Sequence, residues 1–209
     1  KDDNFFKPLN KKVFDMNWNL FEKNFYKNFL DMSDDKLLNK IKKNYDAVCN
    51  QLETQPKVVC HYDYECRNLI FTSSKRAGIL DFQDALIGPI GLDLASLFKD
   101  LYYEWSEERI HSWYKSYISK VKKKFDLELS FESLVKFIDF ASIQRQIRIL
   151  GKLSQVYQQL NREERIKDFP RLINYLVETS SRYTELENLS FAISSLQGPL
   201  NKKMERIFS

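Results

Sequence analysis

Long apolar runs are missing from this sequence. No stretch approaches the roughly 18 to 20 consecutive apolar residues that cross a bilayer as a helix, so we expect no membrane-spanning segment. The first residues also lack the apolar core that a secretory signal peptide needs. Both absences favour a protein that works in the cytoplasm without a membrane partner.

Glycine is scarce as well, with five residues in a chain of 209. None of their spacings matches the G-x-G-x-x-G or Walker patterns, whose glycines let the backbone approach a phosphate closely. We therefore expect no glycine-rich phosphate loop within this chain. The five glycines are Gly78, Gly88, Gly91, Gly151 and Gly198.

Cysteine and net charge are low too. Cys49, Cys60 and Cys66 are an odd number without metal-ligand spacing, so we expect reduced thiols, as is usual in the cytoplasm. The 33 Lys and Arg residues exceed the 29 Asp and Glu residues by only four. This small, scattered excess does not predict nucleic-acid binding, and a macromolecule-binding helical domain would have no other support.

Aromatic residues and helical periodicity are abundant. The chain has 16 Phe, 11 Tyr and 3 Trp, enough to fill the core of one large domain or two small ones. Residues 14–29 carry an aromatic stripe at three- and four-residue spacing, which predicts a buried helix face. Ser33 is a candidate N-cap for a second helix, and most of residues 93–183 is helical in pattern. We expect a single, mainly α domain over residues 1–209.

Residues 57–82 break the helical pattern. Val58–Cys60 and Leu69–Phe71 are short β-like runs, and Ala77–Leu80 is a third run after a polar turn at 73–76. This order predicts a small β-hairpin insertion wrapped by loops, so the polar residues here should be presented rather than buried.

Two further segments carry weaker signals. Gly and Pro residues at 88–91 predict an irregular loop. Residues 186–209 have little periodicity, and Pro199 is expected to interrupt any helix there.

The polar segment His61–Asn68 and the later Asp81 carry the chemistry. Phosphoryl transfer from a nucleotide needs Mg²⁺ held by oxygen ligands and a carboxylate that orients the attacking hydroxyl and takes its proton. Mg²⁺ prefers hard oxygen ligands. Asp63 and Asn68 lie five residues apart on one loop, and Asp81 ends a neighbouring strand. We predict Asp63 as the catalytic base and Asn68 and Asp81 as metal ligands.

These motifs resemble a known family. H-x-D-x-x-x-x-N at 61–68, I-L-D-F-Q-D at 79–84 and G-P-x-x-x-D-L at 88–94 resemble the aminoglycoside phosphotransferase family, relatives of the protein kinases. The segments 80–105 and 144–171 resemble its branch of bacterial sugar kinases. Members of that branch phosphorylate N-acetylmuramate and N-acetylglucosamine at the anomeric hydroxyl during cell-wall recycling.

The resemblance implies a fold, a donor and a metal. It covers the chain from about residue 14 to residue 183 and implies the C-terminal lobe of a protein-kinase-like fold, with its catalytic and metal loops at 57–93. It also implies Mg²⁺ and ATP as co-substrate, although GTP stays open as donor. Such kinases begin with a nucleotide lobe that has a phosphate-covering loop and a strand-borne lysine. We expect that lobe to be absent from this chain.

Residue roles follow from the same resemblance. His61 and Asp93 would support the catalytic loop. Arg67 could pair with a phosphate or with Asp84, and Asp84 could bind a sugar hydroxyl or cap a turn. Further candidates for substrate binding are Tyr102, Trp105, Gln144 and Arg145; core packing is the stronger expectation for Trp105, and a specific acidic partner or ligand is expected for Arg145.

The loop departs from the family pattern at Tyr62, Glu65 and Cys66, and Glu65 adds a negative charge beside the expected substrate site. Our first hypothesis is a sugar kinase; an aminoglycoside or a choline-like alcohol is another acceptor to test. The alternative is a non-catalytic sugar- or partner-binding remnant, inactive for want of the nucleotide lobe. The missing lobe is either truncated or supplied by a separate chain, and the apolar surface where it would dock is expected to promote self-association.

Overall fold

The computed structural model describes residues 5–71 and 77–209. The turn expected at 73–76 lies outside the described residues. The chain divides into two compact units, Lys1–Leu9 with Thr54–Ser142 (the first unit) and Asn10–Glu53 with Ile143–Ser209 (the second unit). Most elements are helices, accompanied by two small antiparallel sheets. The mainly α fold class is confirmed, whereas the single domain and its assignment as a C-terminal lobe remain predictions.

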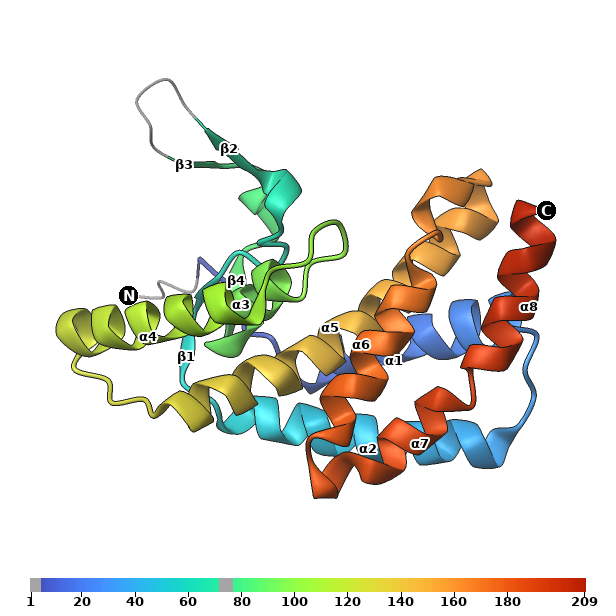
Figure 1. The fold of residues 1–209 in the computed structure, drawn as a ribbon, viewed down its shortest axis with the longest axis horizontal. Coiled ribbons are helices and arrows are strands. Elements are labelled where there is room, and N and C mark those ends of the chain that lie inside the picture. Colours follow the sequence, from blue (N-terminus) through green and yellow to red (C-terminus); the bar gives the residue numbers. More distant parts are fainter. Residues whose placement is uncertain (1–4, 72–76) are drawn as a thin grey trace. The chain divides into compact units, whose positions relative to one another are not determined.

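Two two-stranded sheets lie in the first unit (Figure 1). Strand β2 (Leu69–Phe71) pairs antiparallel with β3 (Ala77–Ile79), which confirms the expected hairpin. Strand β1 (Lys57–Cys60) pairs antiparallel with β4 (Leu86–Pro89), with Lys57 opposite Pro89. Two short 3-10 turns, Cys66–Asn68 and Phe82–Asp84, precede β2 and β4 respectively.

Strand β4 corrects the loop expected at 88–91. Gly88 pairs with Val58 in this strand, and the packing leaves little room for a side chain, because a Cβ there would lie 2.9 Å from the Leu86 side chain. Pro89 is the last residue of the strand, a position where its missing N–H breaks no long ladder. Ile87 gains further backbone bonds, because its N–H donates to the Lys7 carbonyl oxygen and its carbonyl accepts from Leu9 N–H.

Helices α3 (Gly91–Phe98) and α4 (Glu107–Phe125) follow, and α5 (Phe131–Leu160) begins in the first unit. A Cβ at Gly91 would lie 2.4 Å from the Phe137 carbonyl oxygen, so α3 meets the α5 backbone where only glycine fits. The buried Gln55 amide joins the same two elements, since it donates to the Phe137 carbonyl oxygen and accepts from Gly91 N–H.

The second unit contains the predicted aromatic stripe. Helix α1 (Lys11–Leu20) continues as a π-helix over Phe21–Phe29, and α2 (Asp35–Thr54) follows. The stripe is at most 3 % exposed and consists of Phe14, Trp18, Phe21, Phe25 and Phe29, so its burial is confirmed. The expected cap Ser33 is wrong by one residue, because the Asp34 carboxylate accepts from Lys36 N–H and Leu37 N–H.

The rest of the second unit is also helical. Helix α6 (Phe169–Ser181) contacts both α7 (Glu187–Ser194) and α8 (Gln197–Phe208), and short 3-10 turns lie at Glu163–Arg165 and Thr184–Leu186. The weak pattern expected after residue 186 is therefore corrected to two helices. Pro199 lies in the first turn of α8, where a proline removes no intrahelical hydrogen bond. No helix among the described residues is long and apolar enough to cross a membrane.

Candidate active site

The predicted catalytic loop is held at its start by Asp93. The two carboxylate oxygens accept from the backbone N–H groups of His61 at 2.7 Å and Tyr62 at 3.0 Å. Asp93 lies in the first turn of α3, but its side chain binds this distant loop rather than capping the helix. Burial raises the pKa of Asp93, while the two N–H donors lower it again by stabilising the charged form.

Two residues of the site adopt the left-handed backbone region. Tyr62 has φ 77° and Asp81 has φ 65°. Aspartate tolerates this region, but a bulky residue such as tyrosine rarely does. Asp93 binds the Tyr62 N–H and so helps to hold this strained turn, which places Asp63 directly after it.

Hydrogen bonds within the loop bring Asn68 back to Asp63. The Asn68 side-chain amide donates to the Asp63 carbonyl oxygen at 2.8 Å, and Glu65 N–H donates to the same oxygen at 2.9 Å. The Asn68 N–H donates to the Glu65 carbonyl at 3.0 Å. Since the amide nitrogen of Asn68 is a donor here, its Oδ1 is the atom that can bind a cation.

The hairpin joins this loop to Asp81. Leu80 N–H donates to the Asn68 carbonyl oxygen at 2.9 Å. His61 Nε2 lies 2.7 Å from the Leu80 carbonyl oxygen, which can only accept, so Nε2 carries the proton. Leu80, the residue before Asp81, is thus bound to both His61 at the start of the loop and Asn68 at its end. Gln83 in turn donates its amide to the Asp81 carboxylate at 3.0 Å.

The donor chemistry of this site fits a magnesium ion. Asn68 offers an amide oxygen and Asp81 an exposed carboxylate, both of them hard ligands. Among the described residues, no group of three or more His, Cys, Asp or Glu side chains could hold a metal. A set of one amide and one carboxylate suits Mg²⁺ bound mainly to waters and phosphate oxygens, rather than a structural ion in an all-protein cage.

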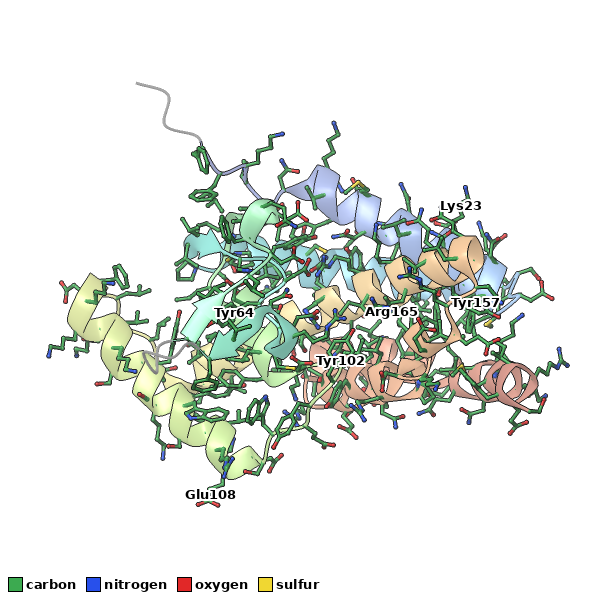
Figure 2. All side chains as sticks on the ribbon, turned by 90° about the horizontal axis from the view of Figure 1, so that it is seen from above. Lys23, Tyr64, Tyr102, Glu108, Tyr157 and Arg165 are labelled. Carbon is green, nitrogen blue, oxygen red and sulfur yellow. The ribbon has the colours of Figure 1, made fainter. Side chains whose placement is uncertain are left out.

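Arg67 pairs with Glu65, a partner that the sequence did not suggest. Its guanidinium donates to the Glu65 carboxylate, with Nε at 3.1 Å. Its Cζ lies 4.1 Å from the centre of the ring of Tyr102, which is labelled in Figure 2. Burial favours the neutral form of Arg67, but the hydrogen bond and the charge of Glu65 raise its pKa. The charge that Glu65 adds to the loop is therefore countered within the loop itself.

The other candidates of the first unit differ in exposure. Asp84 ends the 3-10 turn after Asp81 and is exposed. Trp105 is half-buried, donates its indole N–H to the Leu97 carbonyl oxygen at 3.0 Å and packs against Tyr103 and Trp113. These contacts are those of a packed side chain. Tyr102 is 37 % exposed, and the Arg67 guanidinium packs over its ring.

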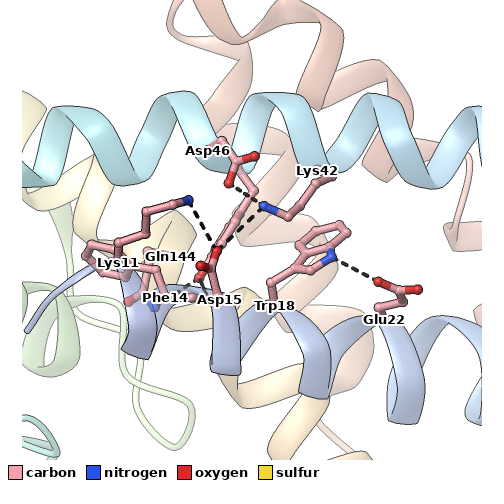
Figure 3. Close-up of polar contacts among 9 residues, drawn as sticks. Lys11, Phe14, Asp15, Trp18, Glu22, Lys42, Asp46 and Gln144 are labelled. Atoms are coloured by element: carbon pink, nitrogen blue, oxygen red, sulfur yellow. Dashed lines mark hydrogen bonds and ion pairs between the residues drawn. The ribbon is translucent and has the colours of Figure 1, made fainter.

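Gln144 and Arg145 lie in the second unit, and both are buried. Figure 3 shows Gln144 in a network of polar contacts, where its amide lies 3.5 Å from the Tyr45 hydroxyl. That hydroxyl donates to the Phe14 carbonyl oxygen at 3.0 Å. A role for Gln144 or Arg145 in substrate binding remains a prediction.

Sequence reasoning missed Asp100. This aspartate is fully buried in the first unit and binds the loop at Cys66. A usable signal exists, because Asp100 and Lys99 are the two charged residues in the otherwise apolar and aromatic stretch from Leu97 to Tyr103, where an unpaired buried charge would be costly.

Comparisons with known proteins point the same way. Residues 16–124 match the model of the phosphotransferase enzyme family. An N-acetylmuramate/N-acetylglucosamine kinase from Neisseria meningitidis serogroup B is 34 % identical over 154 residues, which are 73 % of this chain and 46 % of the relative.

Two relatives of the same name show similar values. The protein from Pseudomonas putida is 33 % identical over 68 % of this chain and 42 % of the relative, and the one from Pseudomonas aeruginosa is 33 % identical over 72 % and 45 %. The chain therefore spans a little less than half the length of these curated relatives.

Proposed function

Because this chain belongs to the phosphotransferase enzyme family, we propose that it carries the catalytic and metal loops of a small-molecule kinase. The enzyme transfers the γ-phosphoryl group of ATP to a sugar hydroxyl. The names of the three relatives favour an amino sugar, N-acetylmuramate or N-acetylglucosamine, with the anomeric hydroxyl as acceptor.

One observation supports this proposal most strongly. The backbone of Asn68 accepts from Leu80 N–H, and the side chain of Asn68 donates to the Asp63 carbonyl oxygen. A single residue thus joins the loop of the proposed base to the strand that leads into Asp81. Phosphoryl transfer depends mainly on positioning and on charge stabilisation, so a rigid frame of this kind is what the chemistry requires.

Each polar side chain then has a distinct task. The Asp63 carboxylate orients the acceptor hydroxyl and takes its proton. Asn68 and Asp81 hold Mg²⁺, which neutralises charge on the phosphate oxygens when it is bound. His61 and Asp93 act as scaffold, since the former fixes the Leu80 carbonyl oxygen and the latter fixes the start of the loop.

The test uses a protein that includes a nucleotide lobe and compares Asp63→Ala with Glu108→Ala, a truncation of an exposed carboxylate in the same unit. The assay measures Mg·ATP-dependent ADP release with N-acetylmuramate, N-acetylglucosamine, an aminoglycoside and choline as acceptors. Loss of a general base lowers turnover by about 10²- to 10⁴-fold, and we expect this drop for Asp63→Ala only. Near-normal turnover of Asp63→Ala would remove Asp63 from its role.

The acceptor panel also distinguishes the alternative function. A non-catalytic binding domain would bind one of the sugars in calorimetry, yet show neither Mg·ATP binding nor ADP release. Selective turnover of choline or the aminoglycoside would keep the phosphotransferase activity and overturn the amino-sugar assignment.

A further inference from the structure

The carboxylate of Asp100 is fully buried, and both of its oxygens are used. Oδ2 accepts from the backbone N–H of Cys66 at 2.7 Å, and Oδ1 accepts from the backbone N–H of Tyr102 at 2.7 Å. Burial and the neighbouring Asp100 raise the pKa of the Cys66 thiol to about 11. Cys66 is therefore a neutral thiol beside the carboxylate.

Asp93 and Asp100 hold the two halves of one loop. Asp93 binds the N–H groups of residues 61 and 62, and Asp100 binds that of Cys66, which begins the 3-10 turn Cys66–Asn68. Hydrogen bonds to an ionised acceptor are shorter and stronger than bonds between neutral groups. The second half of the loop, which ends at Asn68, is thus held by Asp100, a residue outside the motif at 61–68.

The Asp100 carboxylate also holds the backbone of Tyr102, whose ring contacts the Arg67 guanidinium. Arg67 immediately precedes Asn68. Arg67 is also tied to the buried Glu65. Residues 65–68 are therefore fixed both through the backbone at Cys66 and through the side chain at Arg67.

We propose that Asp100 is a positioning residue that sets the orientation of the Asn68 amide by holding the Cys66 N–H and the Tyr102 backbone. This inference rests on the proposed function, in which Asn68 binds Mg²⁺. Asp100 itself does not touch substrate or metal in this account, and it acts through the turn Cys66–Asn68.

Three variants of the 209-residue chain isolate the contact. Asp100→Asn keeps the shape but has one acceptor oxygen for two N–H donors. Cys66→Pro removes the N–H itself, and Cys66→Ala is its matched control, because both lack the thiol and only alanine keeps the donor. Proline is compatible with this position because the preceding residue, Glu65, is extended (φ −106°, ψ 162°).

The readout is the NMR signal of the Asn68 side-chain amide, assigned by its loss in Asn68→Asp, with urea unfolding in parallel. We expect hydrogen exchange of this amide to be about tenfold faster in Asp100→Asn and Cys66→Pro, the factor that follows from losing one hydrogen bond to a charged group. Cys66→Ala should match the parent chain. Should Asp100→Asn not fold, the comparison of Cys66→Pro with Cys66→Ala decides alone.

Unchanged exchange of the Asn68 amide in both variants, with only a loss of global stability, would overturn the positioning role. Titration with Mg·ATP of a protein that includes a nucleotide lobe tests the proposed function separately. If Mg·ATP leaves the Asn68 signal unmoved while the exchange pattern is as expected, the proposed function fails and the positioning role of Asp100 within the loop stands.

Discussion

The carboxylate of Asp93 accepts the backbone N–H of His61 at 2.7 Å, across 32 positions of the sequence. This bond brings the first turn of α3 to the loop that contains Asp63, and His61 continues the connection through its ring to the Leu80 carbonyl oxygen. The half-buried carboxylate of Asp93, the backbone turn at Tyr62 and the ring nitrogen of His61 thus form one frame that supports the proposed active site.

Asp93→Asn should lower the free energy of unfolding by about 1 kcal/mol at pH 7, because the amide can accept only one of the two N–H bonds. Burial raises the pKa of Asp93 above its unfolded value. The native state therefore binds the Asp93 proton more tightly than the unfolded state does. The stability that protonation of Asp93 adds is fully present below the unfolded-state pKa and is lost as the pH rises through the folded-state pKa.

The free energy of unfolding of the parent chain should consequently exceed that of Asp93→Asn by a larger amount as the pH falls from 7 towards 4. Urea unfolding of the two proteins across this range measures this difference. A difference that stays constant or shrinks would contradict the direction of the Asp93 pKa.

Gly91→Ala and Gly151→Ala should each cost about 2 to 3 kcal/mol of stability. In both cases the new Cβ would lie 2.4 Å from a backbone atom, the Phe137 carbonyl oxygen or the Phe21 nitrogen. Gly198→Ala is the control, since a Cβ at this position of α8 would face open space, and alanine there should stabilise by a few tenths of a kcal/mol to about 1. Urea unfolding that ranks the three variants equally would refute this account of the packing.

The loop region exposes large apolar side chains, with Phe71 92 % and Phe82 68 % exposed. We expect the chain to self-associate through them at high concentration. Phe71→Ser with Phe82→Ser should reduce the concentration dependence of the mass measured by light scattering, whereas Phe191→Ser, at a side chain that is also 68 % exposed but in the second unit, should not. A parent chain that stays strictly monomeric would contradict the expectation.

The loop residues could be predicted because their signal is local. Asp63 and Asn68 are joined by a hydrogen bond over five positions, and the hairpin that leads to Asp81 follows directly. The spacing of such residues along the chain reflects their spacing in the fold. The aromatic stripe of α1 was predictable for the same reason, although its π-helical continuation from Phe21 was not.

Long-range contacts were not predictable in the same way. Asp100 accepts the backbone N–H of Cys66, 34 positions away in the sequence, and no local sequence pattern predicts this pairing. Strand β4 was missed because Gly88 and Pro89 are local breakers, whereas pairing with β1 and with residues 7–9 overrides that preference. Pro199 was misjudged because its effect depends on where α8 begins.

Calorimetry of Mg·ATP binding to the parent chain, Asp81→Asn and Asp126→Asn tests most directly whether the loop and the strand end form one metal–nucleotide site. Replacing a carboxylate ligand of Mg²⁺ by an amide removes a charge, and we predict affinity for Mg·ATP at least about tenfold lower in Asp81→Asn but unchanged in Asp126→Asn. Equal affinity of all three proteins for Mg·ATP would contradict the account.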